Sequence, residues 1–255
     1  MTSTSSQLTA TPETDPMPPA LPRAFLQTLF TSLTRTSKSR ASSTPPQSRW
    51  TLLRTLKSEN PNDITGDLHG TATFTPLRKR TPSNLEQNSN DDEHTELLYS
   101  EEGSLPASFG PGLRWTKKYI WRLSPDGKIS VWFVKVDKRY EEGEEEADYL
   151  FHEFDFSTAV SSLSTASASA GEEFVSPPTP PDTGIGSLFK TDTGSGSGTV
   201  VAARGNHLCI NDMYRTAYAF RVQEGSGEVL SWSSRHVVKG PKKGQDIVNL
   251  YSRAS

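Results

Sequence analysis

The feature of this sequence that most constrains its fold is the alternation of apolar and polar side chains over short segments. In residues 113–123 (LRWTKKYIWRL), apolar side chains and Lys117 share one set of alternate positions, and Arg114, Lys118 and Arg122 lie in the other set. Successive side chains of a β-strand point to opposite faces. The segment is therefore predicted to be a strand with one packed face and one face in water.

Strand-like segments recur along the chain, and no helical pattern of useful length separates them. A Pro-Asp-Gly sequence at 125–127 predicts a hairpin turn between two of them. Hairpin-connected strands form an antiparallel sheet, and a long sheet closes or folds over, so the predicted fold class is all-β, an up-and-down barrel of about eight to ten strands. The predicted strands are residues 50–57, 70–75, 96–101, 113–123, 128–136, 148–156, 200–210, 214–222, 228–238 and 246–253.

The segments around the strands predict one domain with a lid. Residues 1–21 have the composition of a disordered tail, and Pro22 opens a helix over 22–33 whose apolar residues form one stripe. A polar linker at 34–48 then leads to a single barrel domain over 49–253, which the helix is expected to cap.

Three polar insertions interrupt the predicted barrel, at 77–95, 137–147 and 157–199. All three are predicted to be disordered because they are polar, and the last is also too long for an ordered loop and rich in Ser, Pro and Gly. The third contains Ser176-Pro177 and Thr179-Pro180, which fit proline-directed phosphorylation or a polyproline ligand for a protein partner. A plain linker is the interpretation we favour.

Composition limits the partners. The hydrophobic share of 33% is low for a fully packed chain, and the net charge of −3 with a pI near 6.0 argues against nucleic-acid binding. The single Cys209 excludes an intramolecular disulfide framework. The N-terminal segment has neither a secretory signal nor an apolar run that spans a membrane. A cytoplasmic location is the expectation, with the nucleus as the alternative.

The order of short motifs along the chain resembles a known family. The motifs are W-x-L-x-R at 50–54, G-x-A-x-F at 70–74, L-Y-x-E at 98–101, F-H-x-F at 151–154, H-x-C-x-x-D-x-Y at 207–214 and V-K-G-P-x-K at 238–243. They resemble the domain-of-unknown-function family 6314, largely fungal and bacterial and regarded as lipocalin-like. That resemblance implies a barrel with a cup-like interior and brings no established activity. A barrel of this type also offers Trp50 a structural partner, because Arg253 of the last strand can stack on it.

Several polar residues share the apolar faces of the predicted strands. Arg54 needs an acceptor if it is buried, and Glu101 is the structural partner that we favour slightly over a ligand carboxylate or phosphate. His152 and His207 also point inward. Histidines inside a small barrel can bind haem iron or act as a general acid or base, although a lone histidine is more often a hydrogen-bonded core residue. No metal site is predicted, and haem is the only cofactor considered.

Two further segments carry chemistry-bearing residues. In residues 207–214 (HLCINDMY), Cys209 is predicted to be a small core residue and Asp212 to organise a bend that anchors Tyr214. The basic turn 239–243, with His236 before it, can grip a phosphate, but we favour a plain hairpin turn.

Two main functional hypotheses follow. The first is a binding module for a small, partly apolar and anionic molecule, with aromatic walls at Trp121, Phe133, Tyr218 and Trp232. The second is an isomerase- or hydrolase-type enzyme that uses His207 or His152, and a third is an interaction scaffold working through the 157–199 loop. The residues predicted to line the interior site are Arg54, Tyr99, Glu101, His152, His207, Tyr214, Tyr218 and Trp232.

Overall fold

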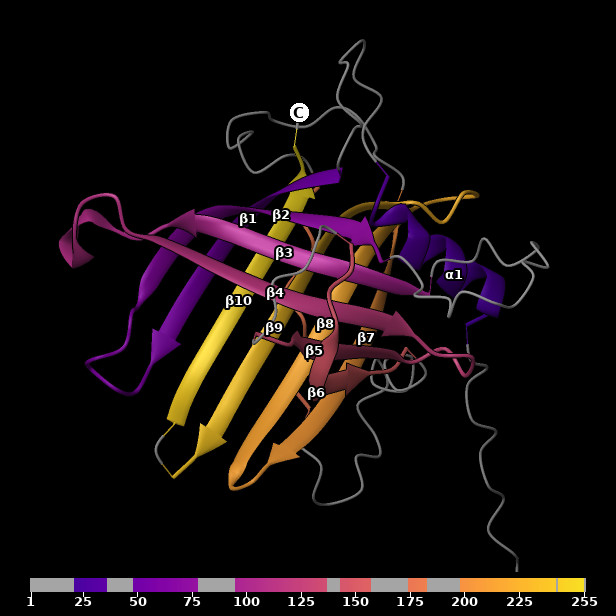
Figure 1. Cartoon of the computed structure of the whole chain (residues 1–255). Helices are drawn as coiled ribbons and strands as arrows, with labels where there is room; N and C mark the ends of the chain where they lie inside the picture. The colour runs from indigo at the N-terminus through magenta and orange to yellow at the C-terminus, as the bar shows by residue number, and fades with distance from the viewer. Residues whose placement is uncertain are drawn as a thin grey trace, which may run out of the picture.

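The computed structural model describes residues 21–35, 48–77, 95–136, 143–156, 174–182, 198–241 and 243–254, and contains ten strands, one α-helix and one short 3-10 helix (Figure 1). The elements are α1 (Arg23–Ser32), β1 (Ser48–Ser58), β2 (Gly66–Pro76), β3 (Glu96–Ser104), η1 (Ala107–Phe109), β4 (Arg114–Leu123), β5 (Ile129–Val134), β6 (Ala147–Phe154), β7 (Gly198–Cys209), β8 (Asp212–Gln223), β9 (Val229–Gly240) and β10 (Lys243–Arg253). In this described part of the chain, no helix is long and apolar enough to cross a membrane.

The ten strands form one antiparallel sheet in the order β6-β5-β4-β3-β2-β1-β10-β9-β8-β7. Apart from the β1–β10 pair, neighbours in the sheet are neighbours in the chain, which is the up-and-down arrangement. The two edge strands approach each other at a bridge between Asp155 and Arg204, whose backbone groups exchange hydrogen bonds of 2.8 and 3.0 Å. The predicted fold class is therefore confirmed as a nearly closed barrel.

The hairpin between β4 and β5 forms at the predicted Pro-Asp-Gly sequence. Ser124 N donates to Lys128 O at 2.9 Å, and Gly127 takes a φ of 88°, which favours glycine. Beyond this hairpin, the described residues of the two strands pair only from Tyr119 to Leu123, whereas β3 pairs with β4 from Arg114 to Arg122. The wall is therefore incompletely paired along residues 114–118.

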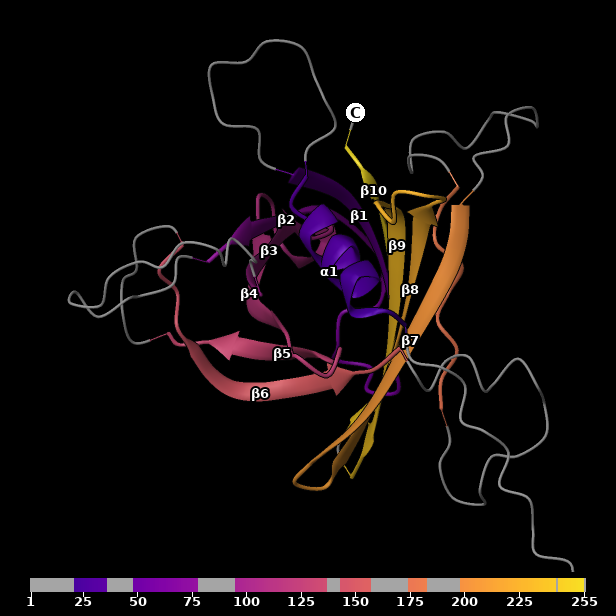
Figure 2. The same ribbon diagram turned by 90° about the vertical axis from the view of Figure 1, so that its right-hand side faces the viewer.

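Helix α1 lies across one end of the barrel (Figure 2) and confirms the predicted lid. Its apolar stripe is buried, and the strand rim binds the carbonyl groups at its C-terminal end. Trp50 Nε1 donates to Leu33 O at 3.2 Å, and Arg253 Nη2 donates to Ser32 O at 2.9 Å. The Arg253 guanidinium also lies 4.4 Å from the Trp50 ring centroid. The expected stacking of this pair is confirmed, and the structure adds that both residues hold the helix.

The apolar core fills the end of the barrel beneath α1. Aromatic rings from several strands pack there in edge-to-face, tilted and stacked pairs. The Phe74 and Trp121 rings, for example, lie 5.2 Å apart at an interplanar angle of 82°. This packing closes one end of the barrel and provides a floor for the space beyond it. The large, fully buried residues of this end are Leu29, Phe30, Leu33, Trp50, Leu52, Phe74, Leu97, Phe154, Phe156, Phe220 and Trp232.

One predicted disordered loop is partly ordered. Residues 174–182 run along the outer wall, where Ser233 Oγ donates to Pro178 O and Arg221 Nη2 donates to Pro180 O at 3.2 Å. The expectation of disorder over 157–199 is therefore wrong for this segment, because barrel hydroxyls and a guanidinium bind its carbonyl groups. Residues 143–147, inside the second predicted loop, are also described. The predicted tail 1–21, the linker 34–48 and the other loop segments lie mostly outside the described residues.

Candidate functional site

Beyond the aromatic floor, the barrel contains a cavity of about 230 Å³. The strand register shows where the cavity lies. Trp50 pairs with Arg253 beside α1, and the cavity-lining pair Arg54 and Asn249 lies four residues further from the helix. The lining residues come from strands all around the barrel and are mostly aromatic or polar. They are Arg54, Tyr99, Glu101, Lys117, Tyr119, Trp121, Val131, Phe151, His152, Tyr214, Tyr218, Trp232, Ser234, His236, Val238, Gln245, Ile247, Asn249 and Tyr251.

A buried ion pair lies in the cavity wall. Arg54 Nη2 donates to Glu101 Oε2 at 2.9 Å, and Arg54 Nε donates to Asn249 Oδ1 at 2.7 Å. Burial disfavours the charged guanidinium, but Glu101, Tyr251 and Tyr99 together outweigh this effect and raise the pKa of Arg54. The chain of hydrogen bonds continues from Asn249 Nδ2 to Ser234 Oγ at 2.9 Å. The Arg54–Glu101 pair that the sequence predicts is confirmed.

Two tyrosines extend this network. The Tyr99 hydroxyl donates to Glu101 Oε2, and the Tyr99 and Tyr251 hydroxyl oxygens are 2.9 Å apart. Burial, reinforced by the Glu101 charge, raises the pKa of Tyr99 well above its ordinary value and also raises the pKa of Tyr251. Both tyrosines are therefore neutral phenols, which supply hydroxyl groups to the cavity without adding charge.

Two histidines face each other in the cavity. His152 Nε2 is 2.7 Å from the Tyr218 hydroxyl, and His236 Nε2 is 3.2 Å from Ser234 Oγ. Their ring centroids are 5.5 Å apart. Burial lowers the pKa of His152 well below its ordinary value. Burial also lowers the pKa of His236 to about 3, and the positive charge of Arg54 adds to this effect. Both imidazoles are neutral at physiological pH, and each can donate or accept a hydrogen bond.

Several buried polar atoms around the cavity have no protein partner. They are Glu101 Oε1, Trp121 Nε1, His152 Nδ1, Trp232 Nε1 and His236 Nδ1, all from cavity-lining residues. Most buried side-chain polar atoms in proteins are hydrogen-bonded, because leaving one unpaired costs about 1–3 kcal/mol. Five such atoms belong to residues that line one cavity, which makes this cavity the candidate site.

The charge of the cavity wall is positive. Among the described lining residues, Arg54 and Lys117 are the cations and Glu101 is the carboxylate, which leaves a net charge of +1. Lys117 lies at the open end, where desolvation and the nearby Arg54 charge lower its pKa. Because Glu101 already binds Arg54, Lys117 is the cation more readily available to an incoming anion.

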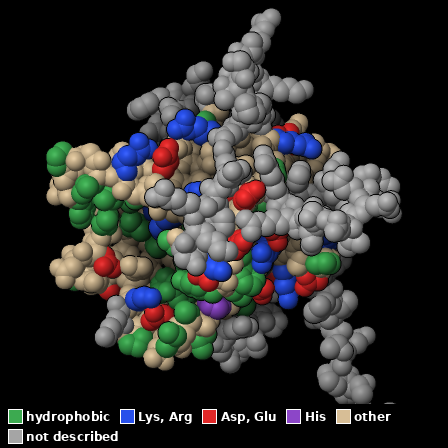
Figure 3. Space-filling view, viewed as in Figure 1, with side chains coloured by type: hydrophobic (Ala, Val, Ile, Leu, Met, Phe, Trp, Pro, Cys, Tyr) green, Lys and Arg blue, Asp and Glu red, His purple; other side chains and the backbone are tan. Residues whose placement is uncertain are grey.

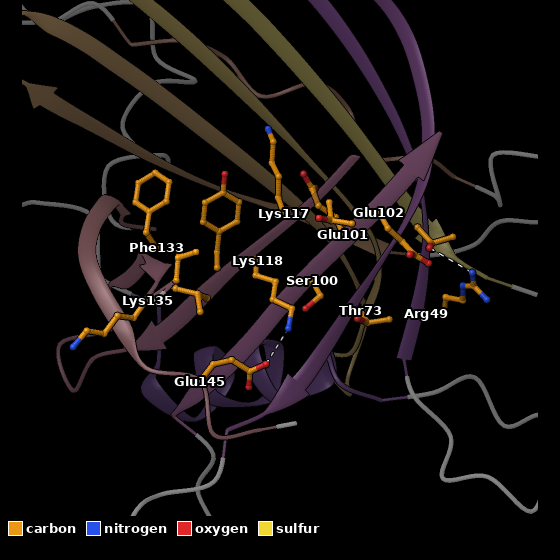
Figure 4. A pocket seen from close by; sticks show the side chains of 15 residues that line it. Arg49, Thr73, Ser100, Glu101, Glu102, Lys117, Lys118, Phe133, Lys135 and Glu145 are labelled. Atoms are coloured by element: carbon orange, nitrogen blue, oxygen red, sulfur yellow. Dashed lines mark hydrogen bonds and ion pairs between the residues drawn. The ribbon is translucent and has the colours of Figure 1, made fainter. Parts of the chain in front are cut away.

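A second and larger hollow of about 1230 Å³ lies along the incompletely paired part of β4 (Figure 4). Figure 4 shows Lys117, Glu101 and Phe133 pointing to one side of the wall, whereas Lys118 lies on the other side and binds Glu145 Oε1 at 3.1 Å. Lys117 and Glu101 line both hollows. Over the visible surface in Figure 3, acidic and basic side chains are interspersed, with no extended patch of one sign.

Seven of the eight residues predicted from the sequence line the cavity. The exception is His207, which is half-buried on β7 and has its ring 6.4 Å from that of Tyr214, outside the lining. Cys209 is exposed, so the prediction that it belongs to the core is wrong. The structure also places Phe133 beside the outer hollow, packed against Tyr149 at 4.5 Å.

Sequence reasoning did not select His236, Tyr251, Asn249 or Lys117 for the site. His236 was assigned to a basic turn, yet it alternates with Trp232 and Ser234 along β9, and this spacing would have placed it inward. The basic turn has structural partners: Lys239 Nζ pairs with Glu59 and Lys243 Nζ with Asp212 Oδ2 at 2.8 Å. Lys243 also donates to the Tyr214 hydroxyl at 3.0 Å, so Asp212 reaches Tyr214 through this lysine.

The cavity does not fit haem. Its volume lies below the range of about 300–1,000 Å³ that is typical of pockets for drug-sized ligands, and haem is larger than many of these. His152 Nε2, a nitrogen suited to bind iron, is engaged by Tyr218. Among the described residues, His, Cys, Asp and Glu side chains form no group of three or more that could hold a metal ion.

The chain is an up-and-down antiparallel β-barrel that is covered at one end by a helix and has an interior cavity lined by aromatic and polar residues. The chain belongs to DUF6314, a family of unknown function, whose model matches residues 47–171 and 186–253. The match covers the barrel strands and begins after α1. No curated protein and no solved structure matches the chain significantly.

Proposed function

We propose that this barrel binds a small aromatic or partly apolar organic anion in its interior cavity. The observation that carries the proposal is the set of five buried polar atoms without protein partners around one cavity. A ligand that supplies hydrogen bonds to them removes a desolvation cost that the folded protein otherwise bears. The lipocalin-like character expected from the family resemblance agrees with this use, since small barrels of that type hold one small ligand inside.

The charge of the wall supports an anion. Arg54 and Lys117 outnumber the single carboxylate, Glu101, and the two histidines are neutral donors or acceptors. The indole N–H groups of Trp121 and Trp232 are donors only. A carboxylate or similar oxyanion can accept hydrogen bonds from these donors, whereas a cationic ligand would meet two positive side chains. Glu101 Oε1 is an acceptor, so its partner would be a donor group elsewhere on the ligand, such as a ring N–H.

The size and walls of the cavity support a compact, flat molecule. A volume of about 230 Å³ holds one ring system with a small substituent, and the walls are rings that stack or meet edge to face. Trp232 and Tyr251, for example, stack with centroids 3.5 Å apart. We also propose that the protein works inside the cell, in keeping with its single Cys209.

Matched ligands test the proposal directly. The full chain is titrated with benzoate and indole-3-carboxylate, and in parallel with their neutral counterparts benzamide and indole, while thermal unfolding is followed. We expect the carboxylates to raise the melting temperature and the neutral molecules to have little effect. Gentle purification followed by mass spectrometry of the extracted small molecules gives an independent measurement. Absence of both a carboxylate-specific shift and a co-purifying organic anion would count against the proposal.

A pair of neighbouring lysines locates the site. Lys117→Gln removes the cation at the open end of the cavity, whereas Lys118→Gln removes a cation on the opposite face that pairs with Glu145. Since a partly exposed ion pair contributes up to about 1 kcal/mol, we expect K117Q to weaken carboxylate binding about threefold to fivefold. K118Q should leave it unchanged. Equal effects of the two variants would place the anion outside the cavity.

Catalysis by His152 is the second candidate. The observation that favours it is the imidazole of a cavity-lining histidine held by Tyr218, whose Nδ1 has no protein partner and can exchange a proton with a ligand. The lowered pKa of His152 keeps the imidazole neutral and also makes it a weaker base. His207 is not part of this arrangement. Mass spectrometry of a bound probe before and after incubation tests for catalysis. Chemical conversion of the probe that is abolished in His152→Gln, while the probe still binds, indicates an enzyme. An unchanged probe indicates a binding protein.

A further inference from the structure

The Pro-rich segment 174–182 has a periodic pattern of exposure on the outer wall. Ser176, Thr179 and Asp182 are exposed, and every residue between them is half-buried or buried. A spacing of three residues is the period of a polyproline II helix. The segment therefore presents one polar edge to solvent and turns its prolines toward the barrel.

The barrel wall beneath the segment is built to receive it. Ala217, Ala219, Ser231 and Ser233 alternate with the core residues of β8 and β9, so they face outward, yet they are buried. Ser231 and Ser233 donate hydrogen bonds to the carbonyl groups of Pro181 and Pro178. Small outward side chains and hydroxyl donors thus form a groove whose occupant is the chain's own Pro-rich segment.

The two exposed hydroxyl groups of the segment have different electrostatic surroundings. Ser176 lines a hollow of about 390 Å³ together with Lys57 and Arg235. Asp246 lies in the same hollow and binds Arg235, with Nη2–Oδ2 at 2.7 Å, so one positive charge remains in excess. Thr179 lies one turn from Asp182, which forms an ion pair with Arg221, so among the described residues no positive charge is in excess beside Thr179.

We propose that Ser176 is the acceptor site of a proline-directed serine/threonine kinase, and that its phosphate is held in the hollow by Lys57 and Arg235. Such kinases require proline directly after the acceptor, and Pro177 satisfies this requirement. The three bound carbonyl groups belong to Pro178, Pro180 and Pro181, all C-terminal to Ser176, and on its N-terminal side the Phe174 ring lies 5.5 Å from the Arg204 guanidinium. Ser176 itself is exposed between these contacts, so its hydroxyl group is accessible to a kinase.

In the transfer step, Ser176 Oγ forms a bond to the γ-phosphorus of MgATP. The bond from that phosphorus to the β–γ bridging oxygen breaks and releases MgADP, and the hydroxyl proton passes to a base of the kinase. The product carries about −1.5 to −2 charges at neutral pH with three acceptor oxygens. Lys57 and Arg235 can then fix the N-terminal part of the segment against β1 and β9.

The test uses the full folded chain, a recombinant mitogen-activated protein kinase and MgATP, with phosphopeptide mapping by mass spectrometry. We expect phosphate on Ser176 and its loss from that peptide in Ser176→Ala. A synthetic peptide of residues 170–186 serves as the reference substrate. Phosphorylation of the peptide on Ser176 without phosphorylation of the folded chain would overturn the proposal, and so would modification confined to Thr179.

Phosphorus NMR tests whether the hollow holds the phosphate. Nearby cations favour the dianion, so the second phosphate pKa, about 6 in a free phosphopeptide, should be lower in the protein by roughly half a unit. Lys57→Gln should remove most of this difference, whereas Lys128→Gln, on the β4–β5 turn, should not. Equal pKa values in protein and peptide would show that the hollow does not hold the phosphate.

Discussion

The buried Arg54–Glu101 pair allows a sharp test of what stabilises this barrel. In Glu101→Gln the Arg54 guanidinium keeps its buried position but loses the carboxylate 2.9 Å away, and both side chains are at most 8% exposed. With an effective dielectric constant of about 20, the attraction at that distance is on the order of 6 kcal/mol. Removing one partner of a buried pair costs about 3–5 kcal/mol. We therefore expect the free energy of unfolding to fall by about 3–5 kcal/mol.

Urea unfolding followed by tryptophan fluorescence measures this loss. The matched control is Glu102→Gln on the next residue of β3, because Glu102 pairs with Arg114 at 3.0 Å while both side chains are largely exposed. That variant should lose no more than about 1 kcal/mol. The double variant R54M/E101L removes both charges and should recover much of the E101Q loss. Equal losses in E101Q and E102Q would refute the reasoning.

Three further predictions concern the lid, the histidines and the seam. Arg253→Ala removes the stack on Trp50 and the hydrogen bond to Ser32 O. It should lower the free energy of unfolding by about 2–4 kcal/mol and accelerate amide hydrogen exchange in α1. Unchanged exchange would mean that other contacts hold the helix. His152 and His236 bind protons below about pH 6.5 in the unfolded chain but stay neutral in the folded protein. The free energy of unfolding should therefore fall as the pH decreases from 6.5, by up to about 1.4 kcal/mol per pH unit for each histidine. Urea titrations at pH 7.0 and 5.5 should then show a smaller difference for His236→Asn than for the unmodified chain, and an identical difference would contradict the neutral state. Gly205→Ala places a Cβ 1.7 Å from Glu153 O where β6 and β7 meet, and should lower the free energy of unfolding by about 1–3 kcal/mol. Gly225→Ala has open space around its Cβ but a φ of 80°, so it is the control for losing a glycine without a steric clash. Thermal unfolding compares the two variants.

The network also separates the roles of individual cavity residues. Arg54, Glu101 and Asn249 bind one another and contribute to folding whether or not a ligand is present. Trp121, Trp232 and the Nδ1 atoms of the two histidines have unused hydrogen-bonding capacity, and they contribute to the proposed binding. Variants of the first group are expected to lower the free energy of unfolding, whereas variants of the second group, like K117Q, are expected to change ligand binding.

The strands, their direction and most of the cavity lining follow from the sequence. Alternation along β4 and β8 predicts which side chains face inward, because a strand permits only two faces, and seven of the eight predicted site residues line the cavity on this basis. His207 shows the limit of the argument. It has inward spacing on β7, but β7 extends beyond the enclosed part of the barrel, and no pattern within one strand indicates where the enclosure ends.

The sequence by itself determined that this chain forms an antiparallel barrel with a helical lid, since side-chain alternation, the Pro-Asp-Gly turn and one apolar helical stripe are local properties. Only the tertiary structure decided which polar residues meet. Arg54 reaches Glu101 and Asn249 across 47 and 195 residues of chain, His236 turns out to face His152, and the Pro-rich segment finds its groove on β8 and β9. These contacts depend on strand register and barrel closure, which bring distant residues together and which no local pattern encodes.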